Sequence, residues 1–296
     1  MAVTSYISYR WVETPLRKAS WNLRLKWRVF AVIFACAAVM ATAARALNSH
    51  IVAPLPAPLT RYAAPEVICH GRVVEDCIRG DLAGNGEVLM IGDSHAAQLN
   101  YFADIVGAFI HARIRVITAS SCVDIAGFDV DRIPPESRVA CREQIERVEK
   151  YLPSAHTIIL AARWDYQLPS AAFVEALEQF FRRAQERGQH VFVMAQVPSL
   201  NINLQRAVRL EALGLRQDVQ ANHEWRRWND ALPALIRPFP NVTLLDFTNI
   251  PLFKTVPFWQ GIPIYSDSDH LNEEGSRLYA EAVKASLGPI LIDAMK

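Results

Sequence analysis

The sequence has few of the residue groupings that hold metal ions. It contains five cysteines without a Cys-x-x-Cys motif, and its eight histidines form no close group. Tetrahedral metal sites are built from such groupings of Cys and His ligands. The sequence therefore predicts no metal site.

The sequence also lacks internal repeats, and its one biased segment is rich in proline. The net charge is only +1, but positive charge is spread unevenly. Residues 1–50 contain seven Lys and Arg residues against one acid, Glu13, which gives this region a charge of +6 and leaves −5 for the remainder. A basic flank beside an apolar run indicates a membrane rather than nucleic acid.

The apolar run extends from Trp27 to Leu47 and carries no charge between Val29 and Ala44. Its length predicts a transmembrane helix over residues 27–47. The positive-inside rule places residues 1–26 in the cytoplasm and the larger C-terminal part outside. A cleaved signal peptide is the alternative, because Ala41-Thr42-Ala43 fits a cleavage site. Both interpretations export the C-terminal part.

A short segment with four prolines follows the apolar run. Residues 48–66 contain Pro54, Pro56, Pro58 and Pro65 among small and polar residues. This composition predicts a semi-extended linker between the membrane and a domain over residues 67–296.

The cysteines agree with export to an oxidising compartment. Cys36 lies in the apolar run, whereas Cys69 and Cys77, and Cys122 and Cys141, form two close pairs. The spacing favours the local disulfides Cys69–Cys77 and Cys122–Cys141, although four cysteines allow three connectivities.

Strand-like and helix-like segments alternate through the rest of the chain. Apolar, β-rich runs at residues 114–118, 157–161, 190–197 and 242–247 are separated by stretches with helical periodicity, including residues 169–187 and 219–236. This alternation predicts a parallel, doubly wound α/β sheet.

One strand leads into a turn that carries a candidate nucleophile. Residues 88–99 read as a buried strand, then Gly92-Asp93-Ser94, then the start of a helix. Ligands bind beyond the carboxyl ends of strands in such sheets, so Ser94 is placed where catalysis is expected. The alternative role for Ser94 is a helix N-cap.

A serine nucleophile needs a base and a group that orients the base. Asp267 and His270 lie three residues apart in a polar loop before a helix, so that one loop carries both. Asp267 would hold the Nδ1 proton of His270, and Nε2 would face Ser94. Capping or packing by His270 and an Asx turn at Asp267 are the alternatives.

These residues resemble a known superfamily. Gly92-Asp93-Ser94-His95 resembles the first block of the SGNH hydrolases, and Asp267-x-x-His270-Leu271 resembles their last block. The α/β-hydrolases use G-x-S-x-G instead, and Ala96 stands at the last position of that motif here. The resemblance implies a flavodoxin-like three-layer α/β sandwich with a parallel sheet of about five strands.

The first residues carry a second resemblance. The segment from Ser5 to Lys18, with Glu13 and Pro15, resembles the end of the membrane acyltransferase-3 domain. In fused members of that family a further transmembrane helix and an SGNH domain follow. The resemblance implies that residues 1–26 are the cytoplasmic end of such a domain, and that the chain is the tail of a longer protein or a split gene product. A basic amphipathic anchor is the alternative.

The family pattern also suggests where the oxyanion would be stabilised. The backbone N–H of Ser94 is one expected donor, and the segment after the second strand offers Ser121 in place of the family glycine. After the third strand the family Gly-x-Asn is missing, and Arg163 is the candidate there. The alternative for Arg163 is a structural ion pair with Asp165 or another acid.

Three aromatic residues are candidates for a sugar-binding groove. Trp164, Trp259 and Tyr265 could cover the apolar face of a pyranose, and Trp259 and Tyr265 lie nearest to His270 in the sequence. Core packing is the alternative for each of them.

The two resemblances together imply an O-acyltransferase, with acetyl as the acyl group, in the bacterial inner membrane with its C-terminal domain in the periplasm. It would modify O-antigen, another exported polysaccharide or peptidoglycan. An acyltransferase-3 domain or protein would supply the acyl group from acetyl-CoA, and no cofactor would bind the exported domain directly. An exported carbohydrate esterase and a non-catalytic glycan-binding module are the alternatives.

Overall fold

The computed structural model describes residue 6 and residues 9–14, 22–51 and 55–296. The chain divides into two compact units, residues 1–54 and residues 55–296.

The first unit is dominated by one long helix, α3 (Leu23–Ile51), with a short π-helical segment, η1 (Tyr9–Glu13), before it. The part Leu23–Ala46 is long and apolar enough to cross a membrane, judged by length and composition. The expected acyltransferase-3-like end at residues 1–26 lies in large part outside the described residues, including Pro15. That assignment therefore stays a prediction.

The second unit contains a six-stranded sheet with the order β1-β3-β2-β4-β5-β6. Five of its strands are parallel, as expected from the sequence, and β1 is added as an antiparallel edge strand beside β3. The strands are β1 (Ile78–Gly80), β2 (Gly86–Gly92), β3 (Ala112–Thr118), β4 (Thr157–Ala161), β5 (His190–Met194) and β6 (Val242–Leu245).

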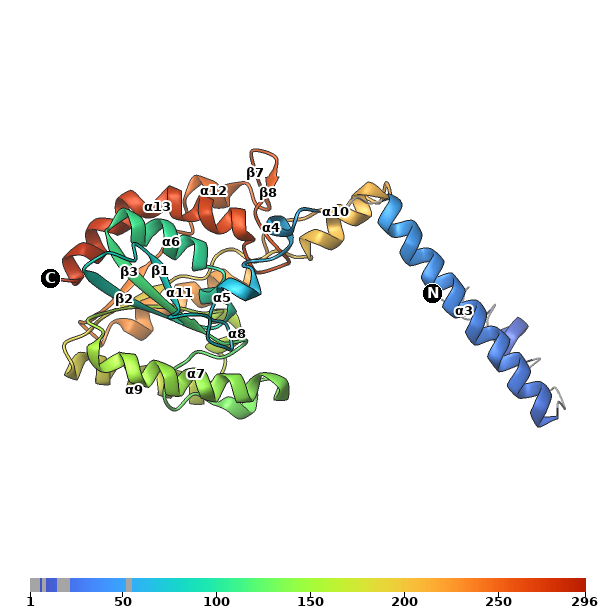
Figure 1. Cartoon of the computed structure of the whole chain (residues 1–296), viewed down its shortest axis with the longest axis horizontal. Helices are drawn as coiled ribbons and strands as arrows, with labels where there is room; N and C mark the ends of the chain where they lie inside the picture. The colour runs from blue at the N-terminus through green and yellow to red at the C-terminus, as the bar shows by residue number, and fades with distance from the viewer. Residues whose placement is uncertain (1–5, 7–8, 15–21, 52–54) are drawn as a thin grey trace. The chain divides into compact units, whose positions relative to one another are not determined.

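Helices cover both faces of this sheet (Figure 1). Side chains of α6 (Asn100–Phe109) and α13 (Glu273–Ala294) pack on one face, and those of α7 (Arg138–Tyr151), α9 (Ala171–Glu186) and α11 (Glu224–Ile236) pack on the other. Successive residues of a strand point to opposite faces of the sheet. Met90 therefore packs in the core on the side of α6 and α13, and Leu89 packs in the core on the side of α7, α9 and α11. The expected three-layer α/β sandwich is confirmed.

Short elements connect these layers. The helical ones are α4 (Ala57–Thr60), α5 (Ser94–Ala97), α8 (Trp164–Gln167), α10 (Leu204–Ala212) and α12 (Pro251–Lys254), and the 3-10 turns are η2 (Pro65–Val67), η3 (Val130–Arg132), η4 (Pro135–Ser137) and η5 (Leu152–Ser154). A small antiparallel hairpin consists of β7 (Phe258–Trp259) and β8 (Ile262–Pro263).

The strand order places a crevice at the end of β2. The chain passes from β2 to β3 on one side and later returns to β4 on the other side, which is the topological switch point where such sheets bind ligands. Gly92 ends β2 with a φ of +145°, and a Cβ there would lie 1.8 Å from the carbonyl oxygen of Ala161 at the end of β4. Only glycine allows the two strand ends to approach so closely.

The second unit contains both expected disulfides. Cys69 is bonded to Cys77, and Cys122 is bonded to Cys141. Each bond closes a loop next to the carboxyl end of β3, because the carbonyl of Cys69 accepts from the Thr118 hydroxyl and Cys122 pairs with Ala119.

The proline-rich segment departs from the expected linker. Of residues 48–66, residues 52–54 lie outside the described part of the chain, but residues 55–66 belong to the second unit. We call residues 55–68 the strap. Its prolines fit a helix start, because Pro56 is the N-cap of α4 and the helix has a proline in its first turn.

Candidate active site

Ser94 stands at the tip of the turn between β2 and α5. Asp93, not Ser94, is the N-cap of α5, since its carboxylate accepts a hydrogen bond of 2.8 Å from the N–H of His95. The capping role proposed as an alternative for Ser94 is therefore taken by its neighbour. Ser94 keeps its hydroxyl for other contacts.

The loop before α13 brings Asp267 and His270 to this serine. Nδ1 of His270 lies 2.9 Å from Oδ2 of Asp267, and Nε2 of His270 lies 2.8 Å from Oγ of Ser94. An ionised Asp267 accepts only, so Nδ1 carries the proton and Nε2 accepts from the Ser94 hydroxyl. The three side chains thus form a continuous hydrogen-bonded chain.

Main-chain contacts fix the shape of that loop. Oδ1 of Asp267 accepts from the N–H groups of Asp269 and His270 at 2.9 and 2.8 Å. The N–H of Leu271 donates to the side chain of Gln98, the residue that ends α5. No sequence pattern indicated this contact, which ties the histidine loop to the serine helix.

The electrostatics around His270 suit a role as a base. Burial disfavours a charged imidazole, but the hydrogen bond to Asp267 and the nearby carboxylates outweigh it and raise the pKa of His270. Burial alone would raise the pKa of Asp267, yet its hydrogen bond with His270 lowers it. Asp267 is therefore ionised at neutral pH and stabilises a proton on His270.

The carboxylate of Asp269 lies close to that of Asp267. Asp269 is 2.7 Å from the guanidinium of Arg163 and 3.5 Å from Nε2 of the buried His95. Burial opposes its ionisation, but the hydrogen bond with His95 and the charges of His270 and Arg163 lower its pKa. Its Oδ1 is 3.8 Å from Nδ1 of His270, beyond hydrogen-bonding distance, so Asp267 is the carboxylate that orients the imidazole.

These groups include the one set of potential metal ligands found among the described residues. His95, Asp269 and His270 each offer one ligand atom, and these atoms lie within 4.8 Å of one another. However, the guanidinium of Arg163 forms an ion pair with Asp269 and would repel a cation. We therefore interpret the set as an ion-pair network, and the absence of a metal site stays a prediction.

Asp93 connects the serine turn to two other loops. Its buried carboxylate accepts from the N–H of Arg163 at 3.0 Å and from Nε2 of Gln167 at 2.8 Å, besides the N–H of His95. Nε2 of Gln167 also donates to the carbonyl of Ser121 at 3.2 Å. Gln167, which sequence reasoning missed, therefore fixes the spacing between the turns after β2 and β3.

The three residues expected to donate to the oxyanion have different surroundings. Ser94 is the first residue of α5, so its N–H has no acceptor within the helix. Ser121 lies in the turn after β3 with a φ of +58°. Arg163 uses its N–H for Asp93 and its guanidinium for Asp165 and Asp269, which is the structural role considered as its alternative.

Two of the three groove aromatics are core residues instead. Trp164 and Tyr265 have no exposed surface, and their polar tips donate to the carbonyls of Met194 and Pro198 at 2.8 and 2.6 Å. The expectation that they line a sugar groove was wrong, because each finds its hydrogen-bond partner inside the protein. Trp259 is half-buried in the β7–β8 hairpin.

The strap contributes an aromatic residue that sequence reasoning missed. The ring of Tyr62 lies over that of His270, with centroids 5.3 Å apart and planes 30° apart, and meets the ring of His70 edge-on at 5.9 Å. Burial and the charge of Asp267 raise the pKa of the Tyr62 hydroxyl. Tyr62 therefore covers His270 as a neutral ring.

His70 supports the turn after β3. Thr118 donates its hydroxyl proton to the carbonyl of Cys69, so it accepts from Nδ1 of His70 at 2.9 Å. Nε2 then accepts from the hydroxyl of Ser120 at 2.9 Å. Burial lowers the pKa of His70 to about 4, so its ring stays neutral and keeps this arrangement at neutral pH.

A family model described as "SGNH domain (fused to AT3 domains)" matches residues 63–285. No curated protein matches the chain.

Several solved structures resemble the chain at low sequence identity. The periplasmic domain of a lipopolysaccharide acetyltransferase from Salmonella serovar Paratyphi A is 16% identical, with 74% of this chain and 91% of that chain covered and a TM-score of 0.49. The acetyl xylan esterase AlAXEase is 12% identical, with 68% and 99% covered and a TM-score of 0.44. An acetylxylan esterase from Geobacillus stearothermophilus is 13% identical, with 70% and 96% covered and a TM-score of 0.41.

Proposed function

The chain belongs to the family of SGNH domains that are fused to AT3 domains, and from this premise we propose that it is an O-acyltransferase for an exported carbohydrate. Acetyl is the proposed acyl group. The observation that carries the proposal is the continuous hydrogen-bonded chain from Asp267 through His270 to Ser94. A serine hydroxyl becomes a nucleophile when a positioned base removes its proton.

In the first half-reaction Ser94 takes the acyl group from the donor. Its Oγ attacks the carbonyl carbon while the hydroxyl proton passes to Nε2 of His270. The carboxylate of Asp267 stabilises the imidazolium that forms. The bond to the leaving group then breaks, the leaving group takes the proton from His270, and an acyl ester on Ser94 remains.

In the second half-reaction a sugar hydroxyl takes the place of the leaving group. It gives its proton to Nε2 of His270 and attacks the ester carbonyl. The bond to Oγ of Ser94 breaks, the serine regains a proton from His270, and an O-acyl sugar leaves. The N–H groups of Ser94 and Ser121 are the proposed donors to the oxyanion in both steps.

The proposal extends to the acyl donor and the acceptor, and the description of the matching family supports the donor part. An AT3 membrane domain or protein would deliver the acyl group, drawn from acetyl-CoA, and the domain itself needs no bound cofactor. Helix α3 would anchor the chain in the bacterial inner membrane with residues 55–296 in the periplasm. O-antigen, another exported polysaccharide or peptidoglycan is the proposed acceptor.

Covalent labelling with a fluorophosphonate tests the nucleophile. We expect the wild-type chain to be labelled at Ser94 and the Ser94→Ala variant to remain unlabelled. Labelling of the variant at the wild-type rate would remove Ser94 from the mechanism. Mass spectrometry of products from 4-nitrophenyl acetate and a saccharide then tests the transfer. Acetate as the sole product with every acceptor would indicate an esterase.

A further inference from the structure

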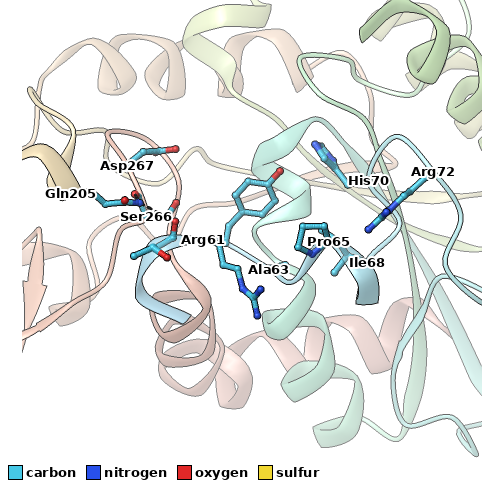
Figure 2. Close-up of a pocket in the computed structure, with 11 residues that line it drawn as sticks. Arg61, Ala63, Pro65, Ile68, His70, Arg72, Gln205, Ser266 and Asp267 are labelled. Carbon is cyan, nitrogen blue, oxygen red and sulfur yellow. Dashed lines mark hydrogen bonds between the residues drawn. The ribbon is translucent and has the colours of Figure 1, made fainter. Parts of the chain in front are cut away.

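A pocket of about 330 Å³ lies beside the catalytic loop, on the side of Asp267. Its volume is at the lower end of the range for small-molecule sites, about 300–1,000 Å³. Figure 2 shows Gln205, Ser266 and Asp267 on one side of it and Ile68, His70 and Arg72 on the other. We propose that this pocket binds the acceptor sugar and selects one that carries an anionic group, a proposal that rests on the proposed function for the role of its occupant.

The strap forms the wall between these two sides. Nε2 of Gln205 donates to the carbonyls of Thr60 and Ser266 at 2.9 and 2.5 Å. The N–H of Glu273 donates to the carbonyl of Arg61 at 3.1 Å, and the guanidinium of Arg61 lies 2.6 Å from the Glu273 carboxylate. These contacts join the strap to α10, the catalytic loop and α13, so the wall has a fixed position.

Tyr62 gives this wall a flat aromatic surface next to the reacting groups. The ring lines the pocket and also lies over the imidazole of His270. A neutral ring covers the C–H face of a pyranose while the sugar hydroxyls remain free to form hydrogen bonds. A sugar packed on Tyr62 would therefore lie on the Asp267 side of the imidazole, next to the catalytic loop.

The polar lining suits a hydroxyl-rich molecule. The amide nitrogen of Gln205 is used by two carbonyls, which leaves Oε1 of the same amide to accept from a hydroxyl. Pro65 and Ile68 supply apolar surface on the opposite side. The lining therefore combines apolar contact with a few hydrogen-bonding groups, as sugar sites require.

Arg72 supplies the selectivity. The charge of Arg61 is matched by Glu273, whereas Arg72 is exposed and has no carboxylate partner among residues 55–296. The charge of Asp267 is directed at His270 and two N–H groups. Arg72 is thus the uncompensated cation of the pocket, and a guanidinium binds a carboxylate or a phosphate with paired hydrogen bonds.

Binding measurements without an acyl donor test this inference. The full chain in detergent micelles is titrated with galacturonate, galactose 6-phosphate and galactose by ligand-observed NMR. We expect both anionic probes to bind about tenfold more tightly than galactose, since a charge-assisted hydrogen bond is lost with the neutral sugar. The two anionic arms report whether carboxylate or phosphate is preferred.

Variants assign the preference to named side chains. Arg72→Ala should remove the advantage of the anionic probes, and Arg187→Ala, which removes an exposed arginine on the far helix layer, should keep it. Tyr62→Ala should weaken all three probes, while Tyr62→Phe keeps the ring and should restore binding. Thermal unfolding of each variant shows whether it is folded.

Two outcomes overturn the inference. One is equal binding of galactose and the anionic probes by the wild-type chain, and the other is an anionic preference that survives in Arg72→Ala. Fluorophosphonate labelling of Ser94 separates this result from the proposed function. Labelling without anionic preference rejects the pocket and keeps the nucleophile, whereas anionic preference without labelling rejects the acyl transfer and keeps the pocket.

Discussion

The substitution Asp267→Asn tests the proposed role of Asp267 in orienting His270. The carboxylate has one oxygen on two N–H groups and the other on Nδ1 of His270. An asparagine that keeps its single oxygen on the two N–H groups must turn its NH₂ group toward Nδ1. Two donors cannot face each other, so the imidazole proton moves to Nε2.

The consequence for Ser94 is a base in the wrong tautomer. Nε2 then donates to Oγ instead of accepting from it, and the serine proton has no acceptor. In hydrolases with a Ser-His-Asp triad this change lowers kcat by about four orders of magnitude. We therefore expect the rate of 4-nitrophenyl acetate hydrolysis by Asp267→Asn to fall by about 10³ to 10⁴.

Asp269→Asn is the matched control. Asp269 is the immediate neighbour of His270 in the sequence, nearer than Asp267, but its oxygen is 3.8 Å from Nδ1 and its ion pair is with Arg163. We expect a loss of about tenfold or less, because only a nearby charge is removed. Circular dichroism shows that both variants are folded. A larger loss in Asp269→Asn, or a loss of less than tenfold in Asp267→Asn, would contradict the role of Asp267 in fixing the tautomer.

Three further predictions concern pH and stability. Because the hydrogen bond with Asp267 raises the pKa of His270, the labelling rate of Ser94 should rise with pH around a midpoint above the ordinary 6.5; a midpoint below 6 would contradict this. Gly92→Ala should lower the free energy of unfolding by at least about 3 kcal/mol in a urea titration, because its Cβ would lie 1.8 Å from the carbonyl oxygen of Ala161; an unchanged midpoint would contradict the close approach. Replacing Cys122 and Cys141 with alanine should cost about 3 kcal/mol in the same titration, since that disulfide spans 19 positions, and no loss would show that the crosslink does not constrain the unfolded chain.

The sheet could be predicted because each parallel strand is a short apolar run. The run at residues 157–161 coincides with β4, and the run at residues 114–118 lies within β3. The short edge strand β1 was not predicted. Only three residues long and half-buried, it has no apolar pattern of its own and depends on pairing with β3.

The candidate triad could be predicted because chemistry restricts its members. A serine after a strand and an aspartate three positions before a histidine occur together once in this chain at the expected places. The connecting residues Gln98 and Gln167 could not be predicted in the same way. A glutamine amide joins loops only through the fold, since Gln167 is 74 positions from Asp93.

The aromatic residues show a limit of local reasoning. Trp164 and Tyr265 have the polar tip and large ring expected of sugar-binding residues, but main-chain carbonyls in the core accept their protons. Tyr62 lies in a proline-rich stretch that predicts a linker. Its position depends on contacts such as that between Arg61 and Glu273, which are 212 positions apart.

The strap determines where this protein can be shortened. A recombinant fragment that starts at residue 67, the boundary suggested by composition, would omit Arg61 and leave Glu273, whose side chain is 5% exposed, without its nearest cation. Such a fragment would be destabilised at the first turn of α13, and it would also lack Thr60 and Tyr62 from the pocket. Inhibitor screens and crystallisation trials should therefore use material that begins at Leu55 or earlier.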